Sequence, residues 1–384
     1  MQTATAPSWF HPHFRLITGG REWSGPDLLN RAQTWPHGGL TADGQDVAGL
    51  AAALIAAWQR GVPLALLRGG LPAPDLRAVT GRVLLLETSG TTGTPKRISR
   101  PFDAILSGIA VPRDGDGGRW LLTYDASGFA GLQVLLTVMS GGGTLLAEPG
   151  ADAATLVRLA AQQQATHISA TPSFWRLMLL SGAHPPLARI TLGGEAADQP
   201  LLDALARCFP SIPIRCIYAS TELGRLFTVT DGKAGFPAAW LSHTPGPYSF
   251  RIWNDILQVA INGMWCDTGD LVELVGDRVL FRGRNDMVLN VGGSKVNPAL
   301  AEARILALPG VDDAVVYGVP NPITGTILVA DIVASDWRGD EHWQSRVTGS
   351  LADLPAAARP RRLRLLDRLP LSAAGKKRRL AEET

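Results

Sequence analysis

The chain is poor in cysteine: it has only Cys208, Cys216 and Cys266, which are widely spaced. Three such residues make no disulfide framework, and their spacing matches no metal-binding motif. Hydrophobic residues, in contrast, make up 46% of the chain, which is enough for a sizeable core. We therefore expect a protein of the reducing cytoplasm that is stabilised by core packing rather than by cross-links.

Net charge and long hydrophobic runs are also lacking. The formal net charge is only +2, which argues against nucleic acid or an anionic membrane surface as the main partner. The longest apolar helical pattern, residues 47–58, is too short to span a bilayer. The first residues show no basic segment followed by an apolar block, so we expect no signal peptide. The prediction is a cytoplasmic protein with no membrane insertion.

The 384 residues suggest two or three domains. Between residues 151 and 218 helical and strand patterns alternate, which is typical of crossover units and a mostly parallel sheet. A smaller α+β pattern begins near Asp286. The predicted fold class is α/β: a large N-terminal domain of packed sheets flanked by helices, residues 1–285, and a small mobile α+β domain, residues 286–384. Helices are predicted at 46–60, 153–164, 173–180, 199–208, 298–308 and 342–354, and strands at 83–86, 166–170, 188–192, 212–218, 257–261, 271–274, 278–281, 314–317 and 327–333.

A polar loop, Thr-Ser-Gly-Thr-Thr-Gly-Thr-Pro-Lys at Thr88 to Lys96, follows an apolar strand pattern. Its hydroxyls, backbone N–H groups and terminal cation suit a polyphosphate, and its glycines allow close approach of the backbone. It lacks the Gly-Lys pair of the common nucleotidase loop. A plain polar surface turn is the alternative for the loop taken alone.

Two further polar segments follow predicted strands of the parallel sheet. They are Gly193-Gly194-Glu195 and Tyr218 to Glu222. Ligands of such sheets bind beyond the carboxyl ends of the strands. We expect both segments to lie near the polar loop.

Five motifs in a fixed order connect these segments. They are residues 88–96, 218–222 (Tyr-Ala-Ser-Thr-Glu), 265–270 (Trp-Cys-Asp-Thr-Gly-Asp), 281–286 (Phe-Arg-Gly-Arg-Asn-Asp) and 369–376 (Leu-Pro-Leu-Ser-Ala-Ala-Gly-Lys). The series resembles the acyl-adenylate-forming superfamily, which includes acyl-CoA and aryl-CoA synthetases, from Val83 to Arg379. The short length is similar to that of some o-succinylbenzoate–CoA ligases.

The resemblance implies that the polar loop holds the β- and γ-phosphates of ATP. It also implies that Glu222 holds Mg²⁺, that Thr221 lies near the α-phosphate, and that Tyr218 stacks on adenine. A core aromatic is the alternative for Tyr218. The loop residues concerned are Thr88, Ser89, Gly90, Thr91, Thr92, Gly93 and Lys96.

The resemblance also implies that Asp270 binds the ribose, and the two acceptor oxygens of a carboxylate suit its vicinal diol. Arg284 matches a second ribose or phosphate contact, and Gly194 and Glu195 match a loop beside adenine and the acyl group. The alternatives are an ordinary Thr-Gly-Asp turn at residues 268–270, a solvated surface arginine, and a plain strand-to-helix turn.

Lys376 matches the mobile lysine that bridges the substrate carboxylate and ATP. A nucleic-acid patch is the alternative for its basic surroundings. Asp286 matches a hinge about which the small domain rotates for the second step. Gly292 and Gly293 match the stretch that then lines a thiol tunnel.

The chain departs from the family pattern at two places. Ala219 replaces a glycine, which we expect to be tolerated. Asp125-Ala126-Ser127 stands where relatives carry a histidine near the acyl substrate, which leaves the acid open. By position, Phe129, His167 and Trp175 are candidates for the substrate pocket, although a core or surface histidine is favoured for His167 and a core residue for Trp175.

The leading hypothesis is ATP-dependent activation of a small carboxylic acid as acyl-AMP, with release of pyrophosphate. Transfer to a thiol follows, either of CoA or of the phosphopantetheine of an acyl carrier protein. An amine or other non-thiol acceptor, and a catalytically silent nucleotide-binding protein, are the alternatives. The oligomeric state, monomer or homodimer, stays open.

Overall fold

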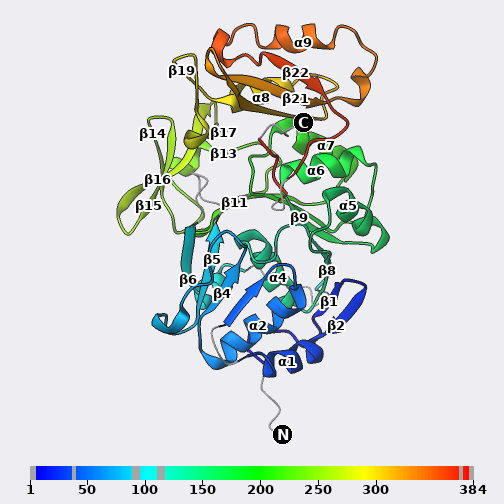
Figure 1. Cartoon of the computed structure of the whole chain (residues 1–384), viewed down its shortest axis with the longest axis vertical. Coiled ribbons are helices and arrows are strands. Elements are labelled where there is room, and N and C mark those ends of the chain that lie inside the picture. The colour runs from blue at the N-terminus through cyan, green and yellow to red at the C-terminus, as the bar shows by residue number, and fades with distance from the viewer. Residues whose placement is uncertain (1–5, 37–39, 89–95, 110–116, 372–374, 380–384) are drawn as a thin grey trace.

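The computed structural model describes residues 6–36, 40–88, 96–109, 117–371 and 375–379. It is elongated, with the N-terminal sheets at one end and the C-terminal α+β unit at the other (Figure 1). The predicted fold class, a large N-terminal domain and a small C-terminal one, is confirmed.

The central sheet has eight strands in the order β12-β11-β10-β9-β7-β8-β1-β2. Its inner neighbours from β11 to β1 pair in parallel, as the alternating pattern predicts, and an antiparallel strand closes each edge. The strands are β1 (Arg15–Thr18), β2 (Arg21–Ser24), β7 (Arg119–Leu122), β8 (Thr144–Ala147), β9 (His167–Ala170), β10 (Arg189–Gly193), β11 (Ile214–Ser220) and β12 (Gly224–Val229).

A second sheet of four strands, in the order β3-β4-β5-β6, delivers the polar loop. Residues 88 and 96 pair across β5 and β6, so the loop connects two antiparallel strands. The strands are β3 (Leu40–Asp43), β4 (Leu64–Leu67), β5 (Val83–Thr88) and β6 (Lys96–Pro101).

Two helices, α2 (Val47–Arg60) and α4 (Phe129–Gly141), belong to the core that the two sheets share. Every residue of α2 from Val47 to Ala57 is buried, as expected of a helix that is apolar on all sides. Three other helices cover the opposite face of the eight-stranded sheet and form a second core. They are α5 (Ala153–Gln162), α6 (Pro172–Leu180) and α7 (Gln199–Cys208). Two short helices complete this part, α1 (Gly25–Gln33) and α3 (Phe102–Ser107).

A five-stranded antiparallel sheet, in the order β13-β17-β16-β15-β14, follows. The strands predicted at 271–274 and 278–281 form a hairpin, in which Val275 pairs with Arg278 around a two-residue turn. The strands are β13 (Phe236–Pro237), β14 (Phe250–Trp253), β15 (Ile256–Ile261), β16 (Met264–Val275) and β17 (Arg278–Arg284).

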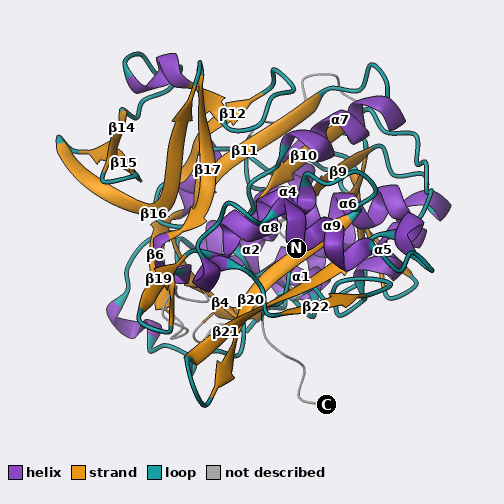
Figure 2. Cartoon of the chain, turned by 90° about the horizontal axis from the view of Figure 1, so that it is seen from above, coloured by secondary structure: helices purple, strands orange, loops and turns teal. Residues whose placement is uncertain are grey.

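The C-terminal unit is a three-stranded sheet packed against helices, with its own core. Seen from above, its strands β20 and β21 cross over the helices of the large domain (Figure 2). Its elements are β18 (Leu289–Val291), β19 (Ser294–Val296), α8 (Pro298–Leu306), β20 (Asp313–Asn321), β21 (Gly325–Val333), α9 (Trp343–Ser350) and β22 (Arg362–Leu365). A short 3-10 turn, Asn285–Met287, connects it to β17.

Candidate active site

The candidate site lies at the carboxyl ends of β9, β10 and β11. Adjacent parallel strands bring Thr171, Gly194 and Thr221 to the same edge of the sheet. Gly194 has φ +82°, a conformation that a side chain would strain. The two polar segments singled out in the sequence, after β10 and at the end of β11, therefore lie side by side.

The Tyr218 hydroxyl donates a hydrogen bond to the Asp270 carboxylate. Arg284 approaches the same carboxylate, with Nη1 3.2 Å from Oδ1. Burial raises the pKa of Asp270, and the Tyr218 hydroxyl and the Arg284 guanidinium offset only part of that effect. The Tyr218 ring also stacks on Phe227, with centroids 4.9 Å apart. The sequence predicted three separate contacts with the nucleoside, whereas the structure joins them into one group.

Thr268-Gly269-Asp270 does not form an ordinary turn. It lies inside β16, where the register shifts between Asp270 and Val272. Gly269 has φ +80°, and a Cβ there would lie 2.7 Å from Nη2 of Arg284. Glycine at 269 therefore allows the arginine to reach Asp270.

Arg100 of β6 holds the Thr221-Glu222 segment, a contact that the motifs did not reveal. Its Nη1 donates to the carbonyl oxygen of Thr221 at 2.9 Å and also to that of Glu222. The strand after the polar loop is thus tied to the segment that ends β11. Arg100 and its two partners are more than a hundred positions apart in the sequence, so no local pattern could have predicted the contact.

Lys376, from the small domain, reaches the strand ends of the large domain. A Cβ placed on Gly194 would lie 3.5 Å from Cε of Lys376. The Thr171 hydroxyl donates to the backbone carbonyl of the neighbouring Gly375. In Figure 1 the red C-terminal segment descends from the small domain to this edge.

Glu195 links the loop after β10 to the surrounding elements. Its Oε2 accepts from the Ser173 hydroxyl at 2.6 Å and from the Ser173 N–H at 3.2 Å. Its Oε1 accepts from the backbone N–H of Lys377 at 3.1 Å. These bonds place Glu195, beside Gly194, between the two domains.

Two of the three pocket candidates do not reach this edge. His167 begins β9, at its amino end, and stacks on Trp120 with centroids 4.5 Å apart. Trp175 is fully buried and donates its indole N–H to the Thr191 carbonyl at 3.0 Å. Trp175 is therefore a core residue, whereas His167 is half-buried and lies at the opposite edge of the sheet from the strand ends. Phe129 is half-buried at the first residue of α4, following the carboxyl end of β7.

Asp125, the first of the two departures from the family pattern, forms an ion pair with Arg68 at 2.8 Å. Its other oxygen accepts from the N–H and the hydroxyl of Ser127, at 2.9 and 2.7 Å. The side chain therefore fixes the turn before α4. Ala219, the other departure, lies at a β-bulge and does not have a positive φ, so alanine fits there without strain.

The polar loop itself, with Ser89, Gly90, Thr91, Thr92 and Gly93, lies outside the described residues. Its ends are placed: the Thr88 hydroxyl donates to the Lys96 carbonyl at 3.4 Å, and Lys96 is exposed. Glu222 also has an exposed side chain. Within the described ranges no three His, Cys, Asp or Glu side chains gather into a metal-binding cluster.

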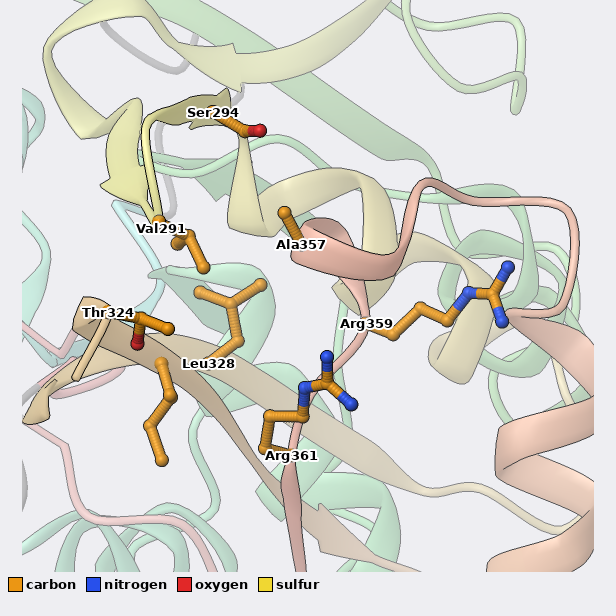
Figure 3. A pocket seen from close by; sticks show the side chains of 9 residues that line it. Val291, Ser294, Thr324, Leu328, Ala357, Arg359 and Arg361 are labelled. Carbon is orange, nitrogen blue, oxygen red and sulfur yellow. The ribbon is translucent and has the colours of Figure 1, made fainter.

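A separate pocket lies within the small domain, beside the β18–β19 hairpin that carries Gly292 and Gly293 (Figure 3). Its volume is about 190 Å³. Apolar side chains form one part of the wall, and Arg359 and Arg361 contribute the charge. Arg359 also donates to the carbonyl oxygens of Leu354 and Ala352, at 2.7 and 2.6 Å.

Two family models match the chain. The AMP-binding enzyme model matches residues 72–255, and the AMP-binding enzyme C-terminal domain model matches residues 301–376. Together they span about two thirds of the chain. The chain belongs to the AMP-binding enzyme family.

Curated relatives of this AMP-binding enzyme include CoA ligases. It is 26% identical to the 3-hydroxybenzoate/4-hydroxybenzoate–CoA ligase of Thauera aromatica, over 76% of the chain and 64% of the relative. It is 28% identical to a probable 2-succinylbenzoate–CoA ligase of Mycobacterium tuberculosis, over 78% of the chain and 83% of the relative. The chain thus spans just under two thirds of the first relative's length.

The fold also matches a solved structure, the o-succinylbenzoate CoA synthetase (MenE) of Bacillus subtilis in complex with the acyl-adenylate OSB-AMP. The TM-score is 0.62 at 19% identity, covering 95% of the chain and 94% of the synthetase. In this AMP-binding enzyme no described helix is long and apolar enough to cross a membrane.

Proposed function

We propose that the protein activates a small carboxylic acid with ATP and transfers the acyl group to the thiol of CoA. The observation that carries the proposal is the position of Lys376 against Gly194, at the strand ends that also carry Thr221. A cation brought there from a second domain suits a reaction that joins two anions. The CoA ligases among the relatives support the same class of reaction.

In the first step a carboxylate oxygen attacks the α-phosphorus, and the bond to the bridging oxygen of pyrophosphate breaks. Lys376 would stabilise the negative charge that both reactants bring, with its long side chain acting as a point charge. Asp270, oriented by Tyr218 and Arg284, would accept hydrogen bonds from the ribose hydroxyls. The polar loop would hold the phosphates that leave.

Glu222 is the residue that would hold Mg²⁺. Its carboxylate is exposed at the strand end, and Arg100 fixes the backbone beneath it. Carboxylate oxygens are ligands that Mg²⁺ prefers, and the ion commonly takes one or two from the protein and the rest from phosphate and water. When bound, the ion would neutralise phosphate charge.

For the second step we propose that residues 1–285 and 286–384 act as two domains with a hinge at Asp286. Rotation would bring the hairpin of Gly292 and Gly293 to the acyl-adenylate, where the thiol attacks the acyl carbon and AMP leaves. The guanidinium groups of Arg359 and Arg361 beside this hairpin favour an acceptor that carries phosphate groups, as CoA does.

A panel of carboxylic acids read by pyrophosphate release, with and without CoA, tests the proposal. We expect release with an aryl or short acyl acid, and a thioester only when CoA is present. An adenylate with no thioester would favour an amine or carrier-protein acceptor, which added amines and a phosphopantetheinylated carrier would distinguish. No release with any acid would favour a silent nucleotide-binding protein.

The Lys376→Ala variant tests the role of the lysine. We expect carboxylate-dependent pyrophosphate release to fall by about two orders of magnitude or more, a size typical for loss of one preorganised charge. Thioester formation from supplied acyl-AMP should survive, because the lysine leaves the site in the second step. Lys233→Ala, at an exposed lysine of the large domain, is the control. Unchanged release in Lys376→Ala would remove this residue from the mechanism.

A further inference from the structure

A second lysine, next to Lys376, has its side chain buried in the small domain. The side chain of Lys377 is 8% exposed, and its Nζ lies 2.8 Å from Oδ1 of Asp313 and 3.7 Å from Oε1 of Glu302. Nζ also donates to the Ala314 carbonyl at 2.6 Å. Burial alone lowers the pKa of Lys377, but the two carboxylates outweigh it and hold the pKa above its ordinary value. Lys377 is therefore a fixed, charged anchor within the small domain.

The large domain contributes Arg176, from α6, to the same group. Its side chain is 7% exposed, and its Nε lies 3.4 Å from Oδ1 of Asp313, the oxygen that Lys377 contacts. Its Nη1 donates to the Asp312 carbonyl at 3.2 Å, and its Nη2 pairs with Asp198 of its own domain. The guanidinium thus joins α6 to the start of β20.

The backbone of Lys377 makes a second connection. Its N–H donates to Glu195 of the large domain at 3.1 Å, while Leu371 and Lys377 pair as an antiparallel bridge. Neighbouring side chains of an extended chain point to opposite sides. With Lys377 directed into the carboxylates of the small domain, Lys376 is directed toward Gly194 of the large domain.

We propose that Arg176 and Lys377 are positioning residues: with Asp313 between them they form a polar latch that holds the small domain in the arrangement that places Lys376 at the strand ends. The latch would favour adenylate formation and would have to open for the thioester step. A buried charge that loses its partner is costly, so arrangements that separate Arg176 from Asp313 are disfavoured. This inference rests on the proposed function only for its consequence in catalysis, not for the existence of the latch.

The distance between the domains tests the latch without any substrate. Spin labels on the exposed native Cys208 of α7 and on Gln344→Cys of α9 report it by pulsed electron resonance, with Cys216 and Cys266 replaced by alanine. With Arg176 intact we expect one dominant narrow distance. Arg176→Met should lower the population of that distance about tenfold relative to others, within the usual range of coupling between sites. Lys377→Met should do the same from the other domain.

Arg278→Met is the matched control. Arg278 is similarly buried, with 11% of its side chain exposed, and pairs with Asp231 at 2.6 Å, but both belong to the large domain. We expect its distance distribution to equal that of the wild type. An unchanged distribution in both latch variants, or an equal change in Arg278→Met, would overturn the proposal.

The two half-reactions then separate positioning from general damage. With the acid that the panel identifies, Arg176→Met should slow ATP–pyrophosphate exchange about tenfold or more, while thioester formation from supplied acyl-AMP is maintained. An equal loss in both half-reactions would indicate a merely structural role and refute the latch. If the wild type activates no acid, the proposed function fails, yet the distance measurement still decides on the latch.

Discussion

Single residues of the candidate site act through their neighbours. Asp270 illustrates this, because its carboxylate receives the Tyr218 hydroxyl on one oxygen and Arg284 on the other. The sequence identified all three residues from separate motifs. It could not show that they touch, since 52 positions separate Tyr218 from Asp270. The adenine and ribose contacts are therefore expected to be coupled rather than independent.

Tyr218→Phe keeps the aromatic ring but removes the hydrogen bond that lowers the pKa of Asp270. The pKa of Asp270 should rise further, so the ionised form that best accepts from ribose is lost at a higher pH. We expect ATP to bind about three- to tenfold more weakly near neutral pH, from the loss of one hydrogen bond. Calorimetric titrations between about pH 5 and 8 should show that the affinity for ATP begins to fall at a higher pH in the variant than in the wild type.

Tyr317→Phe is the control, because Tyr317, Asp331 and Arg364 form the same kind of group in the small domain. It should leave ATP affinity and its pH dependence unchanged. Equal pH profiles for Tyr218→Phe and the wild type would contradict the role assigned to Tyr218.

Among the elements, the buried helix α2 is well specified by local signals. Asp46 caps its first turn by accepting from the Gly49 N–H, and Gly61 ends it with φ +66°. Both ends agree with the range predicted from the sequence. The strand of His167 was also predicted, but the position of that residue relative to the site was not. His167 is the first residue of β9 and lies at the amino edge of the sheet, opposite the site.

Gly61→Ala should reduce the free energy of unfolding by about 1 kcal/mol, because alanine is strained in a left-handed conformation. A Cβ there meets no atom within 4 Å, so the cost is conformational and not steric. Gly349→Ala in α9, also in open space but without a positive φ, should stabilise by about 0.5–1 kcal/mol. Urea denaturation measures both, and a loss of stability of equal size in the two variants would exclude the conformational explanation.

The whole molecule is arranged so that one connection, Asn285–Met287, lies between the nucleoside site and the small domain. Arg284 contacts Asp270 on one side and Asp286 on the other, at 3.2 and 3.1 Å. A conformational change at this connection is therefore expected to affect both the ribose site and the arrangement of the domains.

Asp286→Pro should restrict rotation at this connection, because proline fixes φ near −65°. We expect pyrophosphate release to be largely retained and thioester formation from acyl-AMP to slow by about tenfold or more, since only the second step needs the rotation. Asp286→Ala removes the carboxylate and leaves the backbone free, so it should spare the second step. If both variants slow it equally, the carboxylate and not the rotation is responsible.

The fold class, many of the elements and the order of the motifs follow from the sequence alone, because periodicity, capping residues and polar segments after strands are local properties. The sequence also placed Gly194, Thr221, Asp270 and Lys376 in one candidate site through a family resemblance. The burial of Trp175 and the contact of Arg100 with the Glu222 backbone, in contrast, are properties of the folded molecule. The same holds for the pairing of Lys377 with Asp313 and for the approach of Arg176 to the same carboxylate. Burial and long-range ion pairs depend on which elements pack together, and no local pattern carries that information.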